Sequence, residues 1–346
     1  MELKDLYQKK VDKKSLAACG LAVVQELRLA PQTFFELAEK SSFPTEVLRA
    51  SLNIFLKNGI VENHLGRYVL VDGVGDFVIS GANRASNRKK YRAVVPAKCN
   101  LSLAVVGKED KLHTLDMLFC PFDLVWDEAE FLPDDESSLV IEDATFQGDF
   151  DVDRFSREIK SKIDKLARKF KVSGAVKIRK GVPVGAGLGG STACLVAVYY
   201  AFKKYADENG IKYDVPPKYL ANLSSDFPAM ALARACHVQG IGEKVTPIEE
   251  TAKIKFVGFK VAEGGSDTAS VYAKFDEKGK ILSSNPSETV EDALKNPRND
   301  LFQSACALNK EIKKVYNELK AEKPDFVIMT GSGAGVIALD YKLIDA

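Results

Sequence analysis

The sequence has little of what would tie it to a charged partner, a membrane or an export route. Of its 346 residues, 49 are Lys or Arg and 48 are Asp or Glu, so the net charge is only +1. This balance makes nucleic acid or an acidic macromolecule an improbable partner for the whole chain. No apolar run reaches the roughly 18–20 residues of a membrane span, and residues 1–5 do not resemble the start of a signal peptide. We therefore expect a cytoplasmic protein without a membrane partner.

Cysteine and histidine are too few and too dispersed for a zinc site or a disulfide framework. The six cysteines are scattered, with no Cys-x-x-Cys pair, and there are only three histidines. Structural zinc sites and disulfide-stapled domains both need closer spacing. We expect the thiols to be reduced and mostly buried.

The most informative stretch is a glycine-rich segment, residues 181–192, which precedes a helical pattern over residues 193–205. It reads Gly-Val-Pro-Val-Gly-Ala-Gly-Leu-Gly-Gly-Ser-Thr. Glycine lets a ligand approach the backbone closely, and a helix start adds N–H groups and the positive end of its dipole. The segment is typical of a phosphate-binding loop, although a flexible turn before a core helix has the same composition.

Two common phosphate loops do not fit this segment. Residues 185–190 match Gly-x-Gly-x-x-Gly, but the strand before them is charged and the candidate acid, Asp214, precedes Val-Pro-Pro. A dinucleotide site needs a buried strand at both places. A P-loop ends in Gly-Lys-Ser/Thr, whereas residues 190–192 read Gly-Ser-Thr.

Residues 1–80 have the pattern of a separate small module. Apolar spacing predicts helices over residues 15–29 and 33–40, a third from residue 44 to the Asn-Gly stop at 58–59, and a hairpin over residues 60–71. This is the winged-helix arrangement. Its ten basic and ten acidic residues do not make the basic surface of a groove-reading domain. We therefore favour an interaction or homodimerisation role over nucleic-acid binding.

After a polar and basic linker at residues 81–90, the composition of the chain changes. Strands are expected over residues 92–106 (interrupted at 96–100), 115–126, 138–141, 175–179, 235–247, 253–261 and 326–329. Helices are expected over residues 153–170, 193–205, 218–223, 266–275, 287–294 and 300–319. This order suits α+β layers better than a regular βαβ series. A composition shift near residue 249 divides this part in two.

Several motifs in this part together resemble the GHMP kinases. In chain order they are Val-Pro-Ala-Lys-Cys-Asn-Leu at 95–101, the glycine-rich segment from Pro183, Leu-Ser-Ser-Asp-Phe-Pro at 223–228 with Gly-Ile-Gly-Glu at 240–243, Arg-Asn-Asp-Leu at 298–301 and Met-Thr-Gly-Ser-Gly at 329–333. Within that family they are most similar to the kinases that phosphorylate the 2-hydroxyl of 4-diphosphocytidyl-2-C-methyl-D-erythritol in the non-mevalonate isoprenoid pathway.

The resemblance implies a fold and a reaction. The fold is the two-domain α+β GHMP kinase fold, with a ribosomal S5-like N-terminal ATP-binding domain at residues 91–249 and an α/β C-terminal domain at residues 250–346. The winged-helix-like module of residues 1–80 and the linker of residues 81–90 precede it. The reaction is transfer of a phosphoryl group to an alcohol, with ATP and Mg²⁺ as cofactors and a small-molecule alcohol, cytidine-diphosphate-linked, as partner.

The resemblance also implies roles for single residues. Asp226 is the catalytic acid that takes the substrate hydroxyl proton, and Lys98 pairs with it and keeps it ionised. The ATP-binding residues are Pro183, Gly185, Ala186, Gly187, Leu188, Gly189, Gly190, Ser191 and Thr192. The hydroxyls of Ser191 and Thr192 are the expected Mg²⁺ contacts. On the substrate side the expected residues are Asn100, His113, Phe275, Gly331, Ser332 and Gly333.

Three departures from the family pattern keep alternatives open. Leu112 stands where the family has the tyrosine that stacks on the base. The glycine-rich segment is one residue short of the Gly-Gly-Gly-Ser-Ser run, and the chain stops soon after Leu339, without the expected closing helix and strand. The alternatives are a GHMP kinase for a different small alcohol, or a non-catalytic GHMP-like regulator whose N-terminal module binds DNA or a partner.

Overall fold

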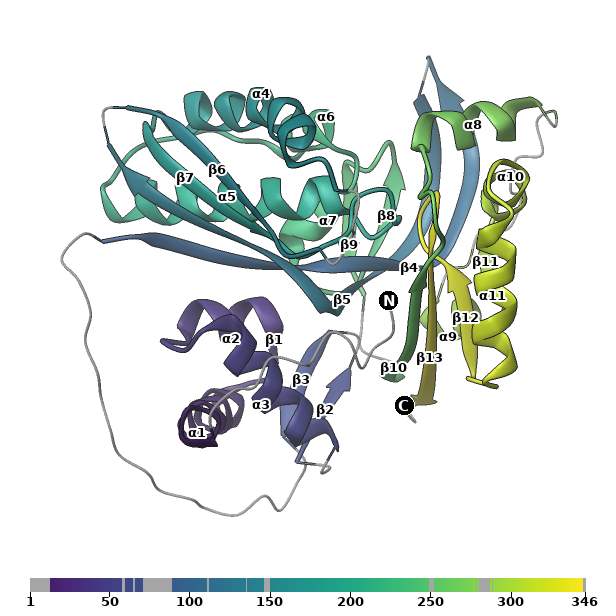
Figure 1. Ribbon diagram of the computed structural model, residues 1–346, viewed down its shortest axis with the longest axis horizontal. Helices are drawn as coiled ribbons and strands as arrows, with labels where there is room; N and C mark the ends of the chain where they lie inside the picture. The colour runs from purple at the N-terminus through teal and green to yellow at the C-terminus, as the bar shows by residue number, and fades with distance from the viewer. Residues whose placement is uncertain are drawn as a thin grey trace.

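The computed structural model describes residues 13–57, 60–64, 66–70, 89–110, 112–134, 136–145, 150–248, 252–277, 279, 287 and 289–344. These residues form a small N-terminal unit, a large sheet with helices on one face, and a smaller C-terminal sheet with helices of its own (Figure 1). Most of the predicted linker lies outside the described residues. No described helix is long and apolar enough to cross a bilayer.

The N-terminal unit, residues 13–70, contains three helices and a three-stranded sheet. Its elements are α1 (Lys13–Leu29), β1 (Gln32–Thr33), α2 (Phe34–Lys40), α3 (Thr45–Lys57), β2 (Val61–His64) and β3 (Arg67–Leu70), with the strand order β1-β3-β2. Thr33 begins α2 with a capping box, because its hydroxyl accepts from the Glu36 amide while the Glu36 carboxylate accepts from the Thr33 amide. The predicted helices and hairpin are confirmed to within a few residues.

The central part is a seven-stranded sheet built on one long antiparallel hairpin. The hairpin strands are β4 (Tyr91–Glu109) and β5 (Leu112–Pro133); the others are β6 (Ser138–Asp143), β7 (Gly174–Lys180), β8 (Cys236–Gly240), β9 (Lys244–Pro247) and β11 (Arg298–Asn299). The helices α4 (Val152–Phe170) and α5 (Gly190–Glu208) cover one face, and the N-terminal unit contacts the other (Figure 1). Two short helices, α6 (Pro217–Leu223) and α7 (Phe227–Leu232), follow α5.

The hairpin strands are longer and less regular than alternation predicts. The interruption expected at residues 96–100 is not a break, because β4 continues through it with shifts in register. The largest shift follows Phe122, which pairs with Ala97, whereas Trp126 pairs with Pro96. Residues 123–125 therefore have no partner on β4. A bulge of this kind bends the strand and re-aims its side chains.

The C-terminal part corrects two expectations. A closing strand, β13 (Gly335–Leu343), follows the second glycine turn and lies between β10 (Ala252–Val261) and β12 (Phe326–Met329). The expected helix over residues 300–319 is two helices, α10 (Phe302–Leu308) and α11 (Glu311–Ala321), beside α8 (Thr268–Glu277) and α9 (Val290–Lys295). Asn309 separates α10 from α11, since its backbone is extended and its side chain donates to the carbonyls of Glu263 and Gly265.

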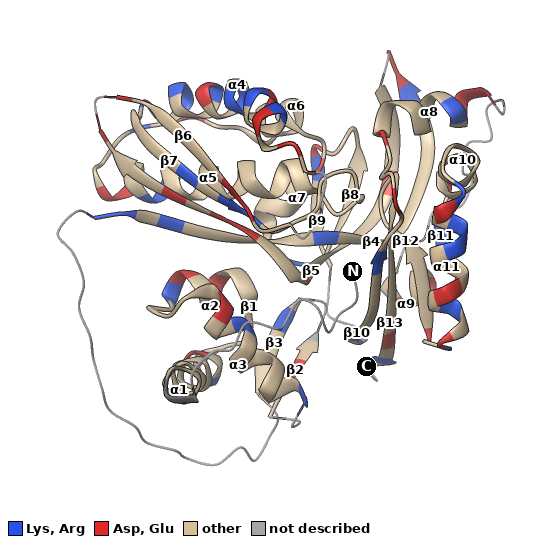
Figure 2. Cartoon of the chain, in the orientation of Figure 1, with Lys and Arg blue, Asp and Glu red and all other residues tan. Residues whose placement is uncertain are grey.

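Along α4 and α11, charged residues of both signs lie on the surface (Figure 2). The Lys180–Asp127 ion pair, in contrast, is fully buried. Lys180 at the end of β7 and Asp127 on β5 are both 0% exposed, and Lys180 Nζ lies 2.7 and 2.9 Å from the two carboxylate oxygens. Asp127 also accepts hydrogen bonds from the amides of Gly181 and Val182. Burial raises the pKa of Asp127, and the charge of Lys180 opposes that rise.

We predict that Lys180→Met lowers the free energy of unfolding by about 3–5 kcal/mol, because it leaves a buried carboxylate without its cation. The double variant Lys180→Met/Asp127→Asn removes both charges and keeps an acceptor oxygen for the two amides, so we expect it to regain much of the loss. Chemical denaturation of both variants measures the difference. A double variant no more stable than the single one would contradict this account of the pair.

Candidate active site

The glycine-rich segment joins β7 to α5 and has a backbone that side chains would block. Gly187 and Gly189 have φ angles of 69° and 72°, which L side chains rarely adopt. A Cβ atom on Gly187 would lie 1.9 Å from the Thr330 carbonyl oxygen, and one on Gly189 would lie 2.7 Å from the Met230 sulfur. Glycine is therefore required at position 187 by conformation and by packing against backbone, and it is favoured at position 189 by conformation.

This segment packs directly on the C-terminal glycine turn, residues 330–335. Three successive carbonyls of the segment, those of residues 185–187, accept hydrogen bonds from the turn. The donors are the Ala334 amide at 2.9 Å, the Gly335 amide at 3.0 Å and the Thr330 hydroxyl at 3.1 Å. The two glycine turns that the sequence analysis singled out thus form one structural unit.

The expected ATP-binding residues divide into buried anchors and a helix start. The side chains of Pro183, Ala186 and Leu188 are buried, so the segment offers a ligand its backbone at these positions. The helix α5 begins at Gly190 and runs to Glu208. A helix of this length has amide groups and the positive end of its dipole at the start, which is suited to an anion such as phosphate.

The two expected Mg²⁺ contacts differ in their surroundings. Ser191 is exposed in the first turn of α5, whereas Thr192 is buried and its hydroxyl lies 2.6 Å from the Ser224 hydroxyl. The described residues contain no group of three or more His, Cys, Asp or Glu side chains that would hold a metal ion. A magnesium ion at this segment would take most of its ligands from phosphate oxygens and water, as this ion usually does.

The two expected catalytic residues lie next to each other beside the glycine-rich segment. Lys98 Nζ is 3.4 Å from Asp226 Oδ2 and donates to Asn100 Oδ1 at 2.7 Å. Lys98 is 3% exposed, whereas the side chain of Asp226 is 24% exposed. The carboxylate is therefore the member of the pair that a ligand can reach, and the ammonium fixes its position from beneath.

The backbone holds both members of this pair in place. The Asp226 carbonyl accepts from the Met230 amide at 2.9 Å, so the residue stands at the start of α7. The Lys98 amide donates to the Leu188 carbonyl at 3.1 Å, which fastens β4 to the glycine-rich segment. The acid, the lysine and the segment thus belong to one rigid arrangement.

Asn100 connects the pair to the C-terminal turn. Its Oδ1 accepts from Lys98 Nζ and also from the Gly331 amide at 3.1 Å. Its backbone N–H donates to the Thr330 hydroxyl at 3.2 Å. Asn100 is fully buried. It holds the lysine against the turn from inside the protein.

Sequence reasoning missed two residues that shape this turn, Thr330 and Asn299. The Asn299 side chain donates to the carbonyl of Met329, just before the turn, at 2.6 Å and to that of Gly331 in the turn at 2.8 Å. The Arg-Asn-Asp-Leu match contained Asn299, so a signal was present but did not reveal the contact. The remaining expected residues, Ser332 and Gly333, complete the turn, and the Ser332 hydroxyl lies 2.9 Å from the Thr268 hydroxyl on α8.

His113 belongs to a second cluster, between β5 and α8. Its Nε2 lies 2.8 Å from one oxygen of Asp276, and Lys108 Nζ lies 2.7 Å from the other. Hydrogen bonds from Lys108 and His113 lower the pKa of Asp276. The His113 ring stacks on Tyr272 with centroids 4.6 Å apart and meets Phe275 edge-on at 6.3 Å.

Tyr272 is an aromatic residue of this cluster that sequence reasoning did not identify. Tyr272 and Phe275 are three residues apart in one helix, a spacing that puts them on the same face and could have revealed the second ring. Burial raises the pKa of Tyr272, and the negative charge of Asp226 adds to the rise. The phenol thus lies within electrostatic reach of the acid. Leu112, in contrast, is 55% exposed.

The comparisons with known proteins identify the family to which this part of the chain is similar. Residues 157–241, which contain the glycine-rich segment and Asp226, match the model of the GHMP kinases N terminal domain. The chain is 34% identical over 259 residues to 4-diphosphocytidyl-2-C-methyl-D-erythritol kinase of Carboxydothermus hydrogenoformans, which spans 72% of this chain and 88% of that relative. A protein of the same name from Methylacidiphilum infernorum is 29% identical over 274 residues, or 74% of this chain and 88% of that relative.

A solved structure is similar over the same share of the chain. The crystal structure of 4-(cytidine 5'-diphospho)-2C-methyl-D-erythritol kinase superposes with a TM-score of 0.54 at 25% identity, covering 72% of this chain and 89% of that one. The α+β GHMP kinase fold and the enzyme class that the motifs indicated, an ATP-dependent phosphotransferase, are confirmed. The chain belongs to the GHMP kinase family.

Proposed function

We propose that the protein phosphorylates the 2-hydroxyl of 4-diphosphocytidyl-2-C-methyl-D-erythritol with ATP and Mg²⁺. The observation that carries this proposal is the Lys98–Asp226 contact of 3.4 Å beside the glycine-rich segment. The 34% identity to a kinase named for this substrate, over 88% of that kinase, supports the choice of acceptor. Bound MgATP supplies the phosphoryl group.

We assign separate roles in the reaction to the residues of the site. The glycine-rich segment and the start of α5 hold the phosphates through backbone N–H groups, which suits a reaction that depends on positioning and on charge stabilisation. Ser191, at the first turn of α5, is the exposed hydroxyl that would contact the metal, with Thr192 behind it. Asp226 accepts the proton of the acceptor hydroxyl, and Lys98 holds the carboxylate in place. Asn100 orients Lys98.

The acceptor lies between the acid and the His113 cluster. Gly331, Ser332 and Gly333 form the wall nearest Lys98 and Asn100, and the His113 cluster takes the cytosine base at the other end. Tyr272 supplies an aromatic face there, supported by Phe275, and so compensates for Leu112. The proposed domain boundaries give a ribosomal S5-like domain at residues 91–249 and an α/β domain at residues 250–346.

The N-terminal unit is proposed as a winged-helix-like module of residues 1–80, followed by a linker of residues 81–90. The helix α3 would be its groove-reading helix, but Thr45 and Arg49 on that helix are buried against the rest of the chain. That orientation weighs against nucleic-acid binding. Homodimerisation through this module remains the favoured partner interaction.

A GHMP kinase for a different small alcohol is the second candidate, and the exposed Leu112 is the observation that favours it. The non-catalytic regulator is set aside, because the relatives over most of this chain are named kinases. Turnover of alcohols with and without a cytidine group separates the two remaining candidates, since the second does not need that group.

We predict that Asp226→Asn lowers kcat by about 10²- to 10⁴-fold, the usual contribution of a general base. The KM for ATP should change little, because Asp226 lies outside the glycine-rich segment. ADP release measured in a coupled assay gives both parameters. Asp214→Asn, at an exposed acid beyond the C-terminal end of α5, is the matched control. Equal rates for Asp226→Asn and the control would refute the assigned role.

We predict that Tyr272→Leu raises the KM for the cytidylated alcohol about tenfold, since stacking on a base contributes about 1–3 kcal/mol. The KM for ATP should stay unchanged. Tyr316→Leu, which removes a tyrosine packed on Phe302 away from the site, is the control. The same assay run on alcohols without a cytidine group tests the substrate itself, and efficient turnover of one of them would establish the second candidate instead.

A further inference from the structure

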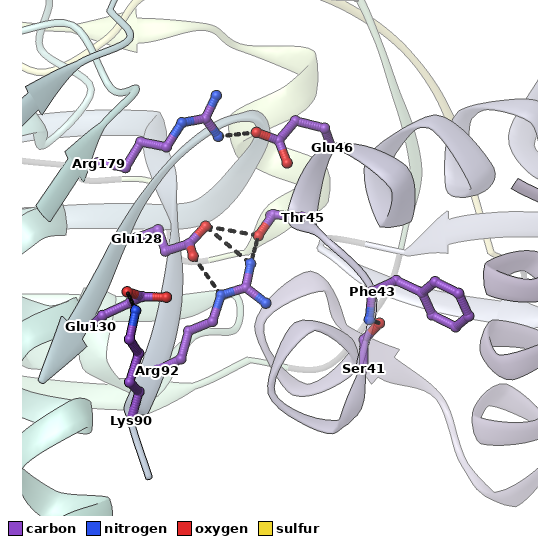
Figure 3. A network of polar contacts seen from close by, with 9 residues as sticks. All are labelled: Ser41, Phe43, Thr45, Glu46, Lys90, Arg92, Glu128, Glu130 and Arg179. Carbon is purple, nitrogen blue, oxygen red and sulfur yellow. Dashed lines mark hydrogen bonds and ion pairs between the residues drawn. The ribbon is translucent and has the colours of Figure 1, made fainter. Parts of the chain in front are cut away.

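The start of α3 is fixed to the outer face of the large sheet by a network of charged residues. Thr45 donates to Glu128 at 2.9 Å, and Arg92 donates to both Thr45 and Glu128. Glu46 pairs with Arg179 on β7. Figure 3 shows Thr45 and Glu46 reaching from the N-terminal unit to these strand residues. The unit is therefore held against the same strands, β4, β5 and β7, that lead into the active site.

Arg49 lies at the centre of this contact. It is 2% exposed, and its Nη1 is 3.2 Å from Asp123 Oδ2 and donates to the Tyr68 hydroxyl at 2.8 Å. Its guanidinium lies 3.9 Å from the centroid of the Phe34 ring and 5.6 Å from that of Trp126. Among the described residues, its Nε and Nη2 have no hydrogen-bond partner.

An arginine paired in this way is a weak source of stability but a strong constraint on position. The free-energy cost of burying the two charges is about as large as the gain from their attraction, whereas loss of one partner leaves the other as an unpaired buried charge. Asp123 also accepts from the Asn63 side chain at 3.3 Å, so the N-terminal unit supplies both of its partners. The location of Asp123 on β5 is thus set by the N-terminal unit.

Asp123 is the first residue of the bulge of β5 and Trp126 directly follows the bulge, opposite the part of β4 that carries Lys98. Trp126 pairs with Pro96 and Pro121 pairs with Lys98, and residues 123–125 between them are unpaired. The hairpin turn of the N-terminal unit, at Gly66, packs on the Pro121 ring. The strand positions on both sides of the bulge therefore touch the N-terminal unit.

The residue after Trp126 reaches the glycine-rich segment. Asp127 accepts from the amides of Gly181 and Val182 at 2.8 and 2.9 Å, the first two residues of that segment. The Trp126 carbonyl oxygen lies so close to Gly181 that a Cβ there would be 2.3 Å from it. A shift of Trp126 would be passed on to the start of the segment, because the two backbones are in direct contact at Gly181.

We infer that Arg49 of the N-terminal unit is a positioning residue for the ATP loop, acting through Asp123, Trp126 and Asp127. The N-terminal unit is then a fixed support of the nucleotide site in its own chain. This inference rests on the proposed kinase function, and it goes beyond it in assigning a catalytic consequence to residues outside the GHMP fold.

The test compares Arg49→Met with Glu62→Gln in the full chain. Glu62→Gln removes another ion pair between the N-terminal unit and the body, and the partner in that pair, Lys253, lies on β10 and not on β5. We expect Arg49→Met to raise the KM for ATP about tenfold, in the range known for coupling through packed side chains. The KM for the alcohol and the parameters of Glu62→Gln should stay within twofold of those of the unaltered chain. A merely structural role would lower the active fraction and leave KM unchanged.

Two results would overturn the inference: an unaltered KM for ATP in folded Arg49→Met, or an equal rise in Glu62→Gln. If Arg49→Met does not fold, Asp123→Asn replaces it and is judged by the same two results. Calorimetric titration with Mg²⁺ and a non-hydrolysable ATP analogue gives a second readout that needs no acceptor. If the unaltered chain binds the analogue but phosphorylates no alcohol, the proposed function fails, and the analogue affinities alone decide on Arg49.

Discussion

The nucleotide site depends on the contacts that the Asp127 carboxylate makes. This carboxylate is enclosed with Lys180 at the point where β5 and β7 meet, and its remaining hydrogen-bonding capacity goes to the two amides that open the glycine-rich segment. A carboxylate in such a place must keep every partner, because an unpaired charge in the interior is far more costly than a weak surface contact. The direction in which the chain leaves β7 is therefore fixed before any ligand arrives.

The rest of the site extends from that fixed start. Three successive carbonyls of the segment accept hydrogen bonds from the C-terminal turn. The turn also donates to Asn100, which holds Lys98 against Asp226. Four distant stretches of the chain are thereby joined by hydrogen bonds and by the Lys98–Asp226 ion pair, and the Asp226 carboxylate stays partly open. Preorganisation of this kind suits phosphoryl transfer, in which little covalent chemistry falls to the protein.

Short motifs allowed much of the site to be predicted. The glycine-rich segment, Lys98 and Asp226 stand in local patterns, and the structure brings the latter two together. Tyr272 was missed although its spacing from Phe275 in one helix was a local signal. Thr330 was missed because its importance comes from contacts with residues far away in the sequence, which no local pattern records. The same limit applies to the fold. Periodicity predicted the helices of the N-terminal unit, but the bulge of β5 and the break at Asn309 depend on tertiary partners that compete with local propensity.

The contact between Thr330 and Gly187 joins residues 143 positions apart, and this has a consequence for biosynthesis. A ribosome releases the chain in order, and domains fold as their residues emerge. The glycine-rich segment leaves the ribosome long before the turn whose donors it needs, so its carbonyls stay in water while the large sheet is already able to form. Closing so long a loop is slow compared with local pairing. The nascent protein is thus a folded sheet first and a nucleotide-binding enzyme only after residues 330–335 have emerged.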